Sequence, residues 1–75
     1  MDWRQHLTAD PAVCHGQVCI RGTRVLVTVI LDCLAAGESA AAIIRSYPSV
    51  SLDDVQAAIA YAAELAHERL VKLPA

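Results

Sequence analysis

Three residues near the N-terminus have the chemistry of metal ligands. Cys14, His15 and Cys19 follow the pattern Cys-His-x-x-x-Cys. Structural zinc sites instead use paired Cys-x-x-Cys ligands and close with four donors. The fourth donor would have to come from elsewhere in the chain, from His6, Cys33 or His67. The spacing therefore favours small buried cysteines on short strands over a metal site, and we expect no metal and no cofactor.

Basic side chains gather around a short turn. Arg21 and Arg24 flank a Gly-Thr pair, and guanidinium groups on a loop with open backbone suit phosphate or carboxylate recognition. Alternatively, Arg24 pairs with Asp10 or Asp32 and fixes the N-terminal part on the first helix. Together with Arg45, the two arginines of the turn are our candidate DNA-binding residues.

No catalytic residue emerges from the sequence. Ser39 and Ser51 occupy positions where their hydroxyls would cap helices. His67 falls on a late helical turn, where a cation suits the helix dipole. A glycine-rich phosphate loop and a nucleophile beside a base are both missing. We therefore expect a protein that is not an enzyme.

The first 27 residues are expected to form short β elements. Apolar runs at residues 12–14 and 17–20 flank His15 and Gly16 and predict a small hairpin, since glycine suits a tight turn. A second turn follows at residues 21–24, and residues 25–27 form a third extended piece. Strands this short do not make a stable sheet alone.

Residues 28–75 are expected to form a helical unit that starts with two short helices. The first runs from about Thr28 to Ala36 and ends at Gly37, in the left-handed position after a helix. Ser39 caps a second helix over residues 40–46, which ends before Pro48.

A long third helix is predicted from about residue 52 to residue 71. Ser51 opens it, and Asp54 completes a short capping box. Three helices in this order resemble a helix-turn-helix unit, so the expected fold is mainly α with a short N-terminal β-hairpin. The C-terminal turns of the third helix would reach beyond their own domain and meet a partner or a second copy. The interface predicted there consists of Leu65, Arg69, Leu70 and Leu73.

Composition limits the size and the partners of the protein. A chain of 75 residues holds one domain. Its hydrophobic fraction of 56% exceeds what so small an interior can bury, so we expect a homodimer. The net charge of -2 argues against a strongly basic nucleic-acid binder.

The sequence also bears on the compartment. No stretch reaches the roughly 18 apolar residues of a membrane span, and the first residues lack the apolar core of a secretory signal. The cysteines, three in all, are odd in number, which fits a reducing compartment. We expect a cytoplasmic protein without a membrane partner.

A longer pattern of short motifs runs through most of the chain. It combines Arg-Gly-Thr-Arg in the first third with Ala-Ala-Gly-Glu-Ser, Tyr-Pro and Leu-Asp-Asp-Val further on. Its main positions are Asp10, Pro11, His15, Gly16, 20–27, Ile30, 34–39, Ile43, Ile44, Tyr47, Pro48, 52–55, Ala57, Ala58 and 60–62. Over about residues 6–63, this pattern resembles the prokaryotic family named domain of unknown function 433.

The resemblance implies a fold and a function. It implies a short β element followed by a homeodomain-like trihelical unit. It also implies an antitoxin of the VapB type, which binds a PIN-like ribonuclease toxin and represses its own operon by binding operator DNA. The third helix of this chain begins with Asp53, Asp54 and Gln56, and carboxylates repel phosphates. Two alternatives stay open: a helix-turn-helix regulator without a toxin partner, and a structural or adaptor homodimer.

Overall fold

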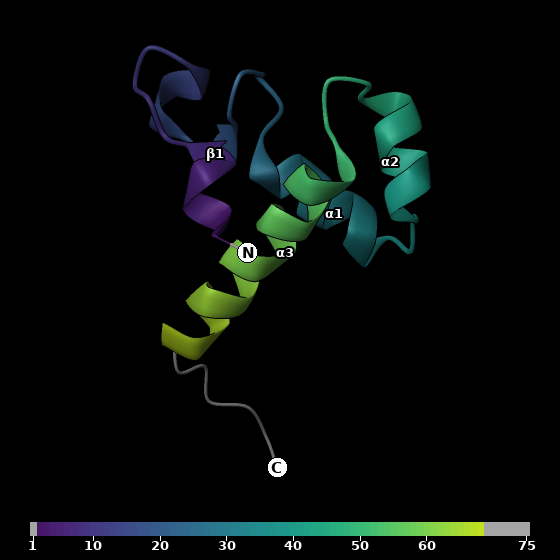
Figure 1. Cartoon of the computed structure of the whole chain (residues 1–75). Helices are drawn as coiled ribbons and strands as arrows, with labels where there is room; N and C mark the ends of the chain where they lie inside the picture. The colour runs from purple at the N-terminus through teal and green to yellow at the C-terminus, as the bar shows by residue number, and fades with distance from the viewer. Residues whose placement is uncertain (1, 69–75) are drawn as a thin grey trace.

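The computed structural model describes residues 2–68 and is mainly helical. Three α-helices follow a short N-terminal β-hairpin (Figure 1). The elements in chain order are the 3-10 helix η1 (Trp3–Gln5), β1 (Leu7–Thr8), the 3-10 helix η2 (Cys14–Gly16), β2 (Cys19–Ile20), α1 (Val27–Ala35), α2 (Ala40–Ser46) and α3 (Leu52–Glu68).

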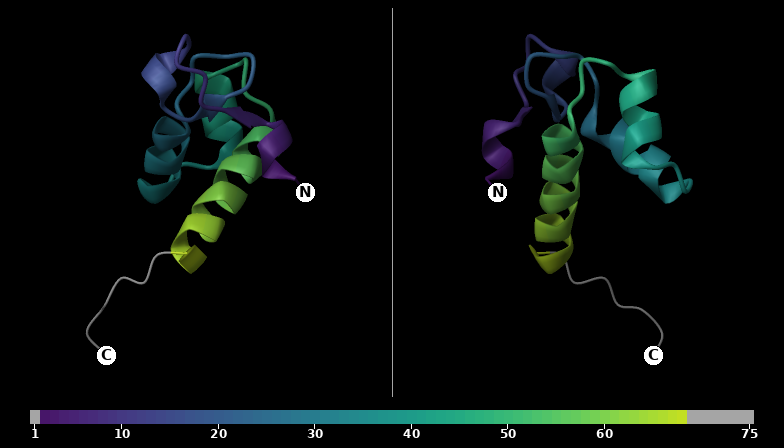
Figure 2. Two further views of the ribbon diagram at one scale, coloured as in Figure 1. Left: turned by 90° about the vertical axis from the view of Figure 1, so that its left-hand side faces the viewer. Right: turned by 45° about the vertical axis from the view of Figure 1, so that its right-hand side comes forward.

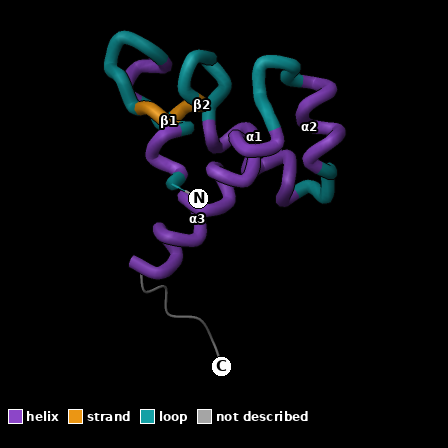
Figure 3. The backbone as a smooth tube through the Cα atoms, viewed as in Figure 1, coloured by secondary structure: helices purple, strands orange, loops and turns teal. Residues whose placement is uncertain are grey.

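The two strands come from different segments than the sequence predicts. β1 pairs with β2 antiparallel, with Leu7 opposite Ile20 (Figure 3). The prediction of a hairpin between residues 12–14 and 17–20 is therefore wrong. The reason lies in the intervening residues, because Cys14, His15 and Gly16 all have positive φ, at 53°, 54° and 80°. Three successive left-handed residues coil the chain into a compact turn and leave no ladder across it.

The extended piece predicted at residues 25–27 is shorter than expected. Leu26 forms a single bridge with Cys19. Val27 already belongs to α1, and its amide donates to the carbonyl of Val18 at 3.0 Å. The boundary between the β region and the helical unit, predicted after residue 27, falls one residue earlier.

The predicted helix signals are confirmed. α2 spans residues 40–46 as expected, and the Ser39 hydroxyl accepts the amide of Ala42 at 3.1 Å. The capping box before α3 is complete, because the Ser51 hydroxyl accepts the Asp54 amide at 3.1 Å and the Asp54 carboxylate accepts the Ser51 amide at 3.0 Å. Gly37, which follows the C-cap residue Ala36 of α1, has a φ of 92°. The predicted end of the third helix, residues 69–71, lies outside the described residues.

The core lies where the three helices meet the hairpin. Its buried members come from both strands, all three helices and the segment before α3: Leu7, Cys19, Ile20, Val27, Ile30, Ile43, Val50, Val55, Ala57 and Ala58. α3 is the longest helix, and its last turns project past α1 and α2 (Figure 2). The first turns of α3 are consequently the ones that contribute most to this core.

Side chains of the N-terminal segment contact α3 at three positions along the helix. The rings of Trp3 and Tyr61 meet edge to face, with centroids 5.1 Å apart. Nδ1 of His6 lies 3.0 Å from the carboxylate of Asp54. One turn beyond Tyr61, the Arg4 guanidinium lies 3.4 Å from the Glu64 carboxylate. The segment before β1 therefore covers one side of α3.

Candidate partner-binding site

An open apolar groove runs between α1 and the C-terminal half of α3. It has a volume of about 570 Å³. Tyr61 and Leu65 of α3 form one wall, and the turn before β2 closes one end. We call this surface the Tyr61 groove; it is lined by Gly16, Gln17, Val18, Val27, Thr28, Leu31, Tyr61 and Leu65.

A second hollow adjoins the Tyr61 groove. It has a volume of about 300 Å³ and lies between the N-terminal segment and α3, where Trp3 and Leu7 line it. Val18 and Tyr61 line both hollows. The half-buried side chains of these two residues therefore divide one apolar face into two depressions.

The position of Tyr61 is fixed by the N-terminal segment. The ring of Trp3 meets it at an angle of 66°, which is a favourable arrangement of aromatic quadrupoles. The Arg4 guanidinium in turn lies 4.3 Å from the centre of the Trp3 ring. These contacts hold one wall of the groove in place before any partner binds.

The turn that closes the groove is strained. Cys14 and His15 hold left-handed conformations that cost residues other than glycine about 1–2 kcal/mol each. Gly16, the next residue, lines the groove itself. Strain of this kind persists where the surrounding structure requires it, and it gathers at functional sites.

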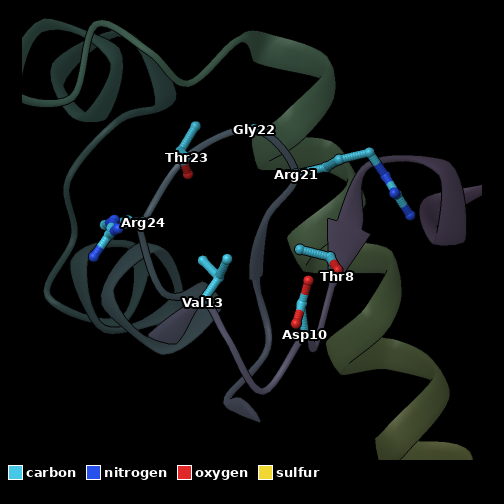
Figure 4. A pocket seen from close by; sticks show the side chains of 7 residues that line it. All are labelled: Thr8, Asp10, Val13, Arg21, Gly22, Thr23 and Arg24. Carbon is cyan, nitrogen blue, oxygen red and sulfur yellow. The ribbon is translucent and has the colours of Figure 1, made fainter. Parts of the chain in front are cut away.

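The Arg-Gly-Thr-Arg segment forms a tight turn with its own hollow. Gly22 has a φ of 80°, and the Thr23 hydroxyl donates to the carbonyl of Ile20 at 2.8 Å and accepts the amide of Val25 at 3.0 Å. The hollow beside the turn has a volume of about 370 Å³, and Figure 4 shows the carboxylate of Asp10 next to it.

Arg21 is engaged with the backbone of the N-terminal segment. Its guanidinium donates to the carbonyl oxygens of Gln5 at 3.1 Å, Leu7 at 3.0 Å and Arg4 at 3.4 Å. The Arg21 amide also donates to the carbonyl of His6 at 2.8 Å. Figure 4 shows the side chain leaving the hollow in the direction of η1. Arg21 thus joins two segments of the fold.

Arg24 and Arg45, the other two arginines proposed for DNA contact, are exposed. Within residues 2–68, the ion pairs involve neither of them. The predicted pairing of Arg24 with Asp10 or Asp32 is therefore wrong. The turn that carries Arg24 and the end of α2 that carries Arg45 lie at the same end of the molecule (Figure 1).

Cys14, Cys19 and Cys33 all lie within the described residues. The part of the chain that the structure describes contains no group of three or more side chains that could hold a metal ion. Cys19 is fully buried, and its thiol donates to the carbonyl of Thr23 at 3.7 Å. Burial, together with the neighbouring Cys14, raises the pKa of the Cys19 thiol. All three thiols, including Cys33, are free. The expectation of a buried cysteine on a strand is confirmed for Cys19.

Only one residue of the predicted interface, Leu65, belongs to the described residues. Leu65 is half-buried and lines the Tyr61 groove. Arg69, Leu70 and Leu73 lie outside the described residues. The sequence did not indicate Tyr61 or Leu31 as site residues. The spacing of Tyr61 and Leu65, four residues apart on a helix, was the signal that could have found Tyr61.

One of the two carboxylates in the first turn of α3 has an internal role. Partial burial by itself raises the pKa of Asp54, but hydrogen bonds from the Ser51 amide and from His6, with a further contribution from the Ser51 hydroxyl, leave this pKa below its usual value. Asp53 is exposed instead. Of the two acidic residues, Asp53 alone faces solvent at the start of α3.

None of the helices in residues 2–68 combines the length and the apolar character that crossing a bilayer requires. No curated protein and no solved structure matches this sequence. A family profile does match it, over residues 7–62. That family is described as proteins of unknown function, DUF433, and the match covers most of the 75 residues. The chain therefore belongs to the DUF433 family.

Proposed function

We propose that this protein is a non-enzymatic, antitoxin-like component of a prokaryotic toxin–antitoxin pair. It would bind and neutralise a PIN-like ribonuclease toxin. The observation that carries the proposal is the Tyr61 groove, an open apolar surface of about 570 Å³ between α1 and α3. Such a groove takes the apolar face of a partner helix or strand.

The lining of the groove favours a protein partner over a small molecule. Leu31 and Leu65 supply aliphatic surface and Tyr61 supplies an aromatic ring, the residue type most often found at the energetic centre of protein interfaces. Small-molecule sites add convergent polar or charged groups to an enclosed cavity. The lining of this groove includes no charged side chain. An apolar peptide segment is the ligand that matches these properties.

The arrangement of the elements supports two further parts of the proposal. We assign the three helices to the homeodomain-like class, because two short helices precede a longer one and α2 and α3 are joined by a short turn. We place the protein in the cytoplasm, because its three cysteines are free thiols and such thiols persist in a reducing compartment.

Repression of its own operon is the second candidate function. It is favoured by Arg24 and Arg45, which are exposed; the turn and the helix end that carry them lie at the same end of the molecule. Guanidinium groups free of carboxylate partners are available for DNA phosphates. The Asp54 carboxylate is engaged by His6 and by the Ser51 amide, so Asp53 is the one exposed carboxylate of the two at the start of α3.

Binding to the toxin-like product of a neighbouring gene tests the main proposal. The test compares wild type with Thr28→Glu and Leu65→Glu, which place a charge in the Tyr61 groove. Thr28 is exposed, so its substitution leaves the core intact. Ala41→Glu on the exposed side of α2 is the matched control. We expect at least tenfold weaker binding and loss of ribonuclease inhibition for both groove variants, with Ala41→Glu unchanged. Wild-type affinity of both groove variants, measured by calorimetry, would refute the proposal.

A further inference from the structure

α3 carries a second face, apolar except for one glutamine, that the groove does not use. Its members are exposed and are spaced four, three, four and three residues apart. Leu52 is 64% exposed and Ile59 is 39% exposed, and these two are the large hydrophobic side chains that residues 2–68 leave exposed. We call this face the α3 seam; it consists of Leu52, Gln56, Ile59, Ala63 and Ala66.

The seam lies opposite the face that α3 turns to its own domain. At about 100° per residue, Ile59 and Ala63 fall on the far side of the helix from Tyr61 and Leu65, which line the groove. Ala57 and Ala58, about 160° and 100° from Ile59 around the helix, are buried on the domain side, and Val55, about 40° from Ile59, is buried at the edge of the seam. Nothing in residues 2–68 covers the seam, so its apolar atoms face solvent in a single chain.

We propose that the α3 seam pairs with the same seam of a second copy of this chain, as an antiparallel two-helix coiled coil. The alternating spacing of four and three residues is the heptad repeat of such pairs. Over residues 52–68 the helix is about 25 Å long at 1.5 Å per residue, enough for two heptads. In the sequence the same spacing continues to Leu70 and Leu73, which lie outside the described residues.

The side-chain sizes indicate self-pairing. In an antiparallel pair centred near residue 61, Ile59 faces Ala63 of the partner subunit, and by symmetry Ala63 faces the partner's Ile59. Gln56 likewise faces Ala66 of the partner subunit. A large side chain meets a small one in each of these layers, which lets the two helices approach closely. In a twofold dimer, a residue that contacts a second residue of the partner subunit is contacted in the same way by the partner. Both of these pairs follow that rule.

The Asp53 carboxylate beside the seam indicates the antiparallel direction. Asp53 flanks the N-terminal end and His67 flanks the C-terminal end, and both are exposed. An antiparallel pair brings Asp53 toward His67 of the partner subunit and aligns the two helix dipoles favourably. A parallel pair would instead bring Asp53 toward Asp53 of the partner subunit, which is repulsive.

This arrangement leaves the Tyr61 groove open in the dimer. The inference does not rest on the proposed antitoxin function, because it uses a different face of α3. It also gives different faces of α3 to the protein partner and to the second copy, whereas the sequence analysis placed both contacts on the C-terminal turns of this helix. Leu65 belongs to the groove, whereas the positions that face the second copy start at Leu52 and include Ile59.

The mass of the protein in solution tests the dimer. Multi-angle light scattering of the full chain at about 50 µM should give about 16 kDa, twice the 8.0 kDa of one chain. Ile59→Lys and Ala63→Lys should each weaken the dimer at least tenfold and shift the mass toward one chain. Ala41→Lys, on the exposed side of α2, is the control and should stay dimeric. Circular dichroism verifies that each variant is folded.

Disulfide trapping tests the direction. A mixture of Gln56→Cys and Ala66→Cys chains should form the mixed disulfide upon oxidation, because the antiparallel pair places these positions opposite each other. A parallel pair would cross-link Gln56→Cys to itself. Wild type, with its own three thiols, is the control. A monomeric wild type, a dimer that both lysine variants leave intact, or self-cross-linking of Gln56→Cys would each overturn the inference.

Discussion

At the scale of single residues, Asp54 connects two parts of the fold. Its carboxylate accepts the amide of Ser51 at 3.0 Å, and its second oxygen lies 3.0 Å from Nδ1 of His6. The Asp54 side chain is only 16% exposed. One carboxylate therefore starts α3 and also holds the N-terminal segment against it.

We expect Asp54→Asn to lower the free energy of unfolding at pH 7 by about 1 kcal/mol, the usual size of a lost capping interaction. The pKa of Asp54 is lowered in the folded protein. The charged carboxylate therefore stabilises the fold above the unfolded-state pKa of about 3.9, and this contribution is lost as the pH falls through the lowered folded-state pKa. The difference between wild type and variant should thus vanish in acid.

Urea unfolding at a series of pH values measures this difference. Asp53→Asn, at the exposed neighbouring position, is the matched control and should cost less than Asp54→Asn at pH 7. A deficit of Asp54→Asn that is as large at pH 2 as at pH 7 would show that the carboxylate charge has no role in the stability of α3.

At the scale of elements, Arg21 holds the hairpin and η1 together. Its three guanidinium contacts are all to carbonyl oxygens of residues 4, 5 and 7. β1 and β2 are only two residues long each, and a ladder this short has little stability of its own. The side chain of Arg21 therefore supplies part of the pairing energy that the strands lack.

We expect Arg21→Ala to lower the melting temperature by several degrees, because about 1 kcal/mol corresponds to roughly 4–8 °C in a domain of this size. Arg24→Ala is the matched control from the same turn, and it should melt like wild type because Arg24 is exposed and has no ion pair within residues 2–68. Scanning calorimetry provides the comparison. Equal melting temperatures for the two variants would mean that the carbonyl contacts of Arg21 contribute nothing.

At the scale of the whole molecule, charge is distributed unevenly. The net charge is -2, yet the turn that carries Arg24 and the end of α2 that carries Arg45 lie at the same end of the molecule. The Tyr61 groove and the α3 seam are both apolar and lie on opposite sides of α3. These are the three separate surfaces to which we assign the proposed contacts with DNA, with a protein partner and with a second copy.

If the protein binds operator DNA, we expect Arg24→Ala and Arg45→Ala each to reduce the slope of log K against log salt concentration by about 0.9, the value for one lost phosphate contact. Arg21→Ala should change that slope less, because the Arg21 guanidinium is engaged with backbone carbonyls. Fluorescence anisotropy measures the slope. About 50 to 200 mM salt is a suitable range, because the affinity of proteins that contact phosphates falls steeply across it. Loss of binding in Gln56→Ala with both arginine variants unaffected would place DNA on α3 instead.

Local signals in the sequence determined the helices. Ser39 and Pro48 bound α2, Gly37 takes the left-handed conformation after α1, and Ser51 caps α3. Each of these effects depends on residues within one helical turn, so composition and spacing suffice to predict it. The family pattern was likewise readable along the chain, and the profile match over residues 7–62 confirms it.

Only the tertiary structure decided the strand pairing and the faces of α3. The partner of β2 is β1 and not the adjacent apolar run, because the left-handed turn at Cys14 and His15 redirects the chain. The contact between His6 and Asp54 joins residues 48 positions apart. The apolar positions of α3 are similar in sequence, and packing alone separates the groove residue Leu65 from the exposed Ile59. Long-range contacts of this kind depend on how the elements dock, which local propensities do not specify.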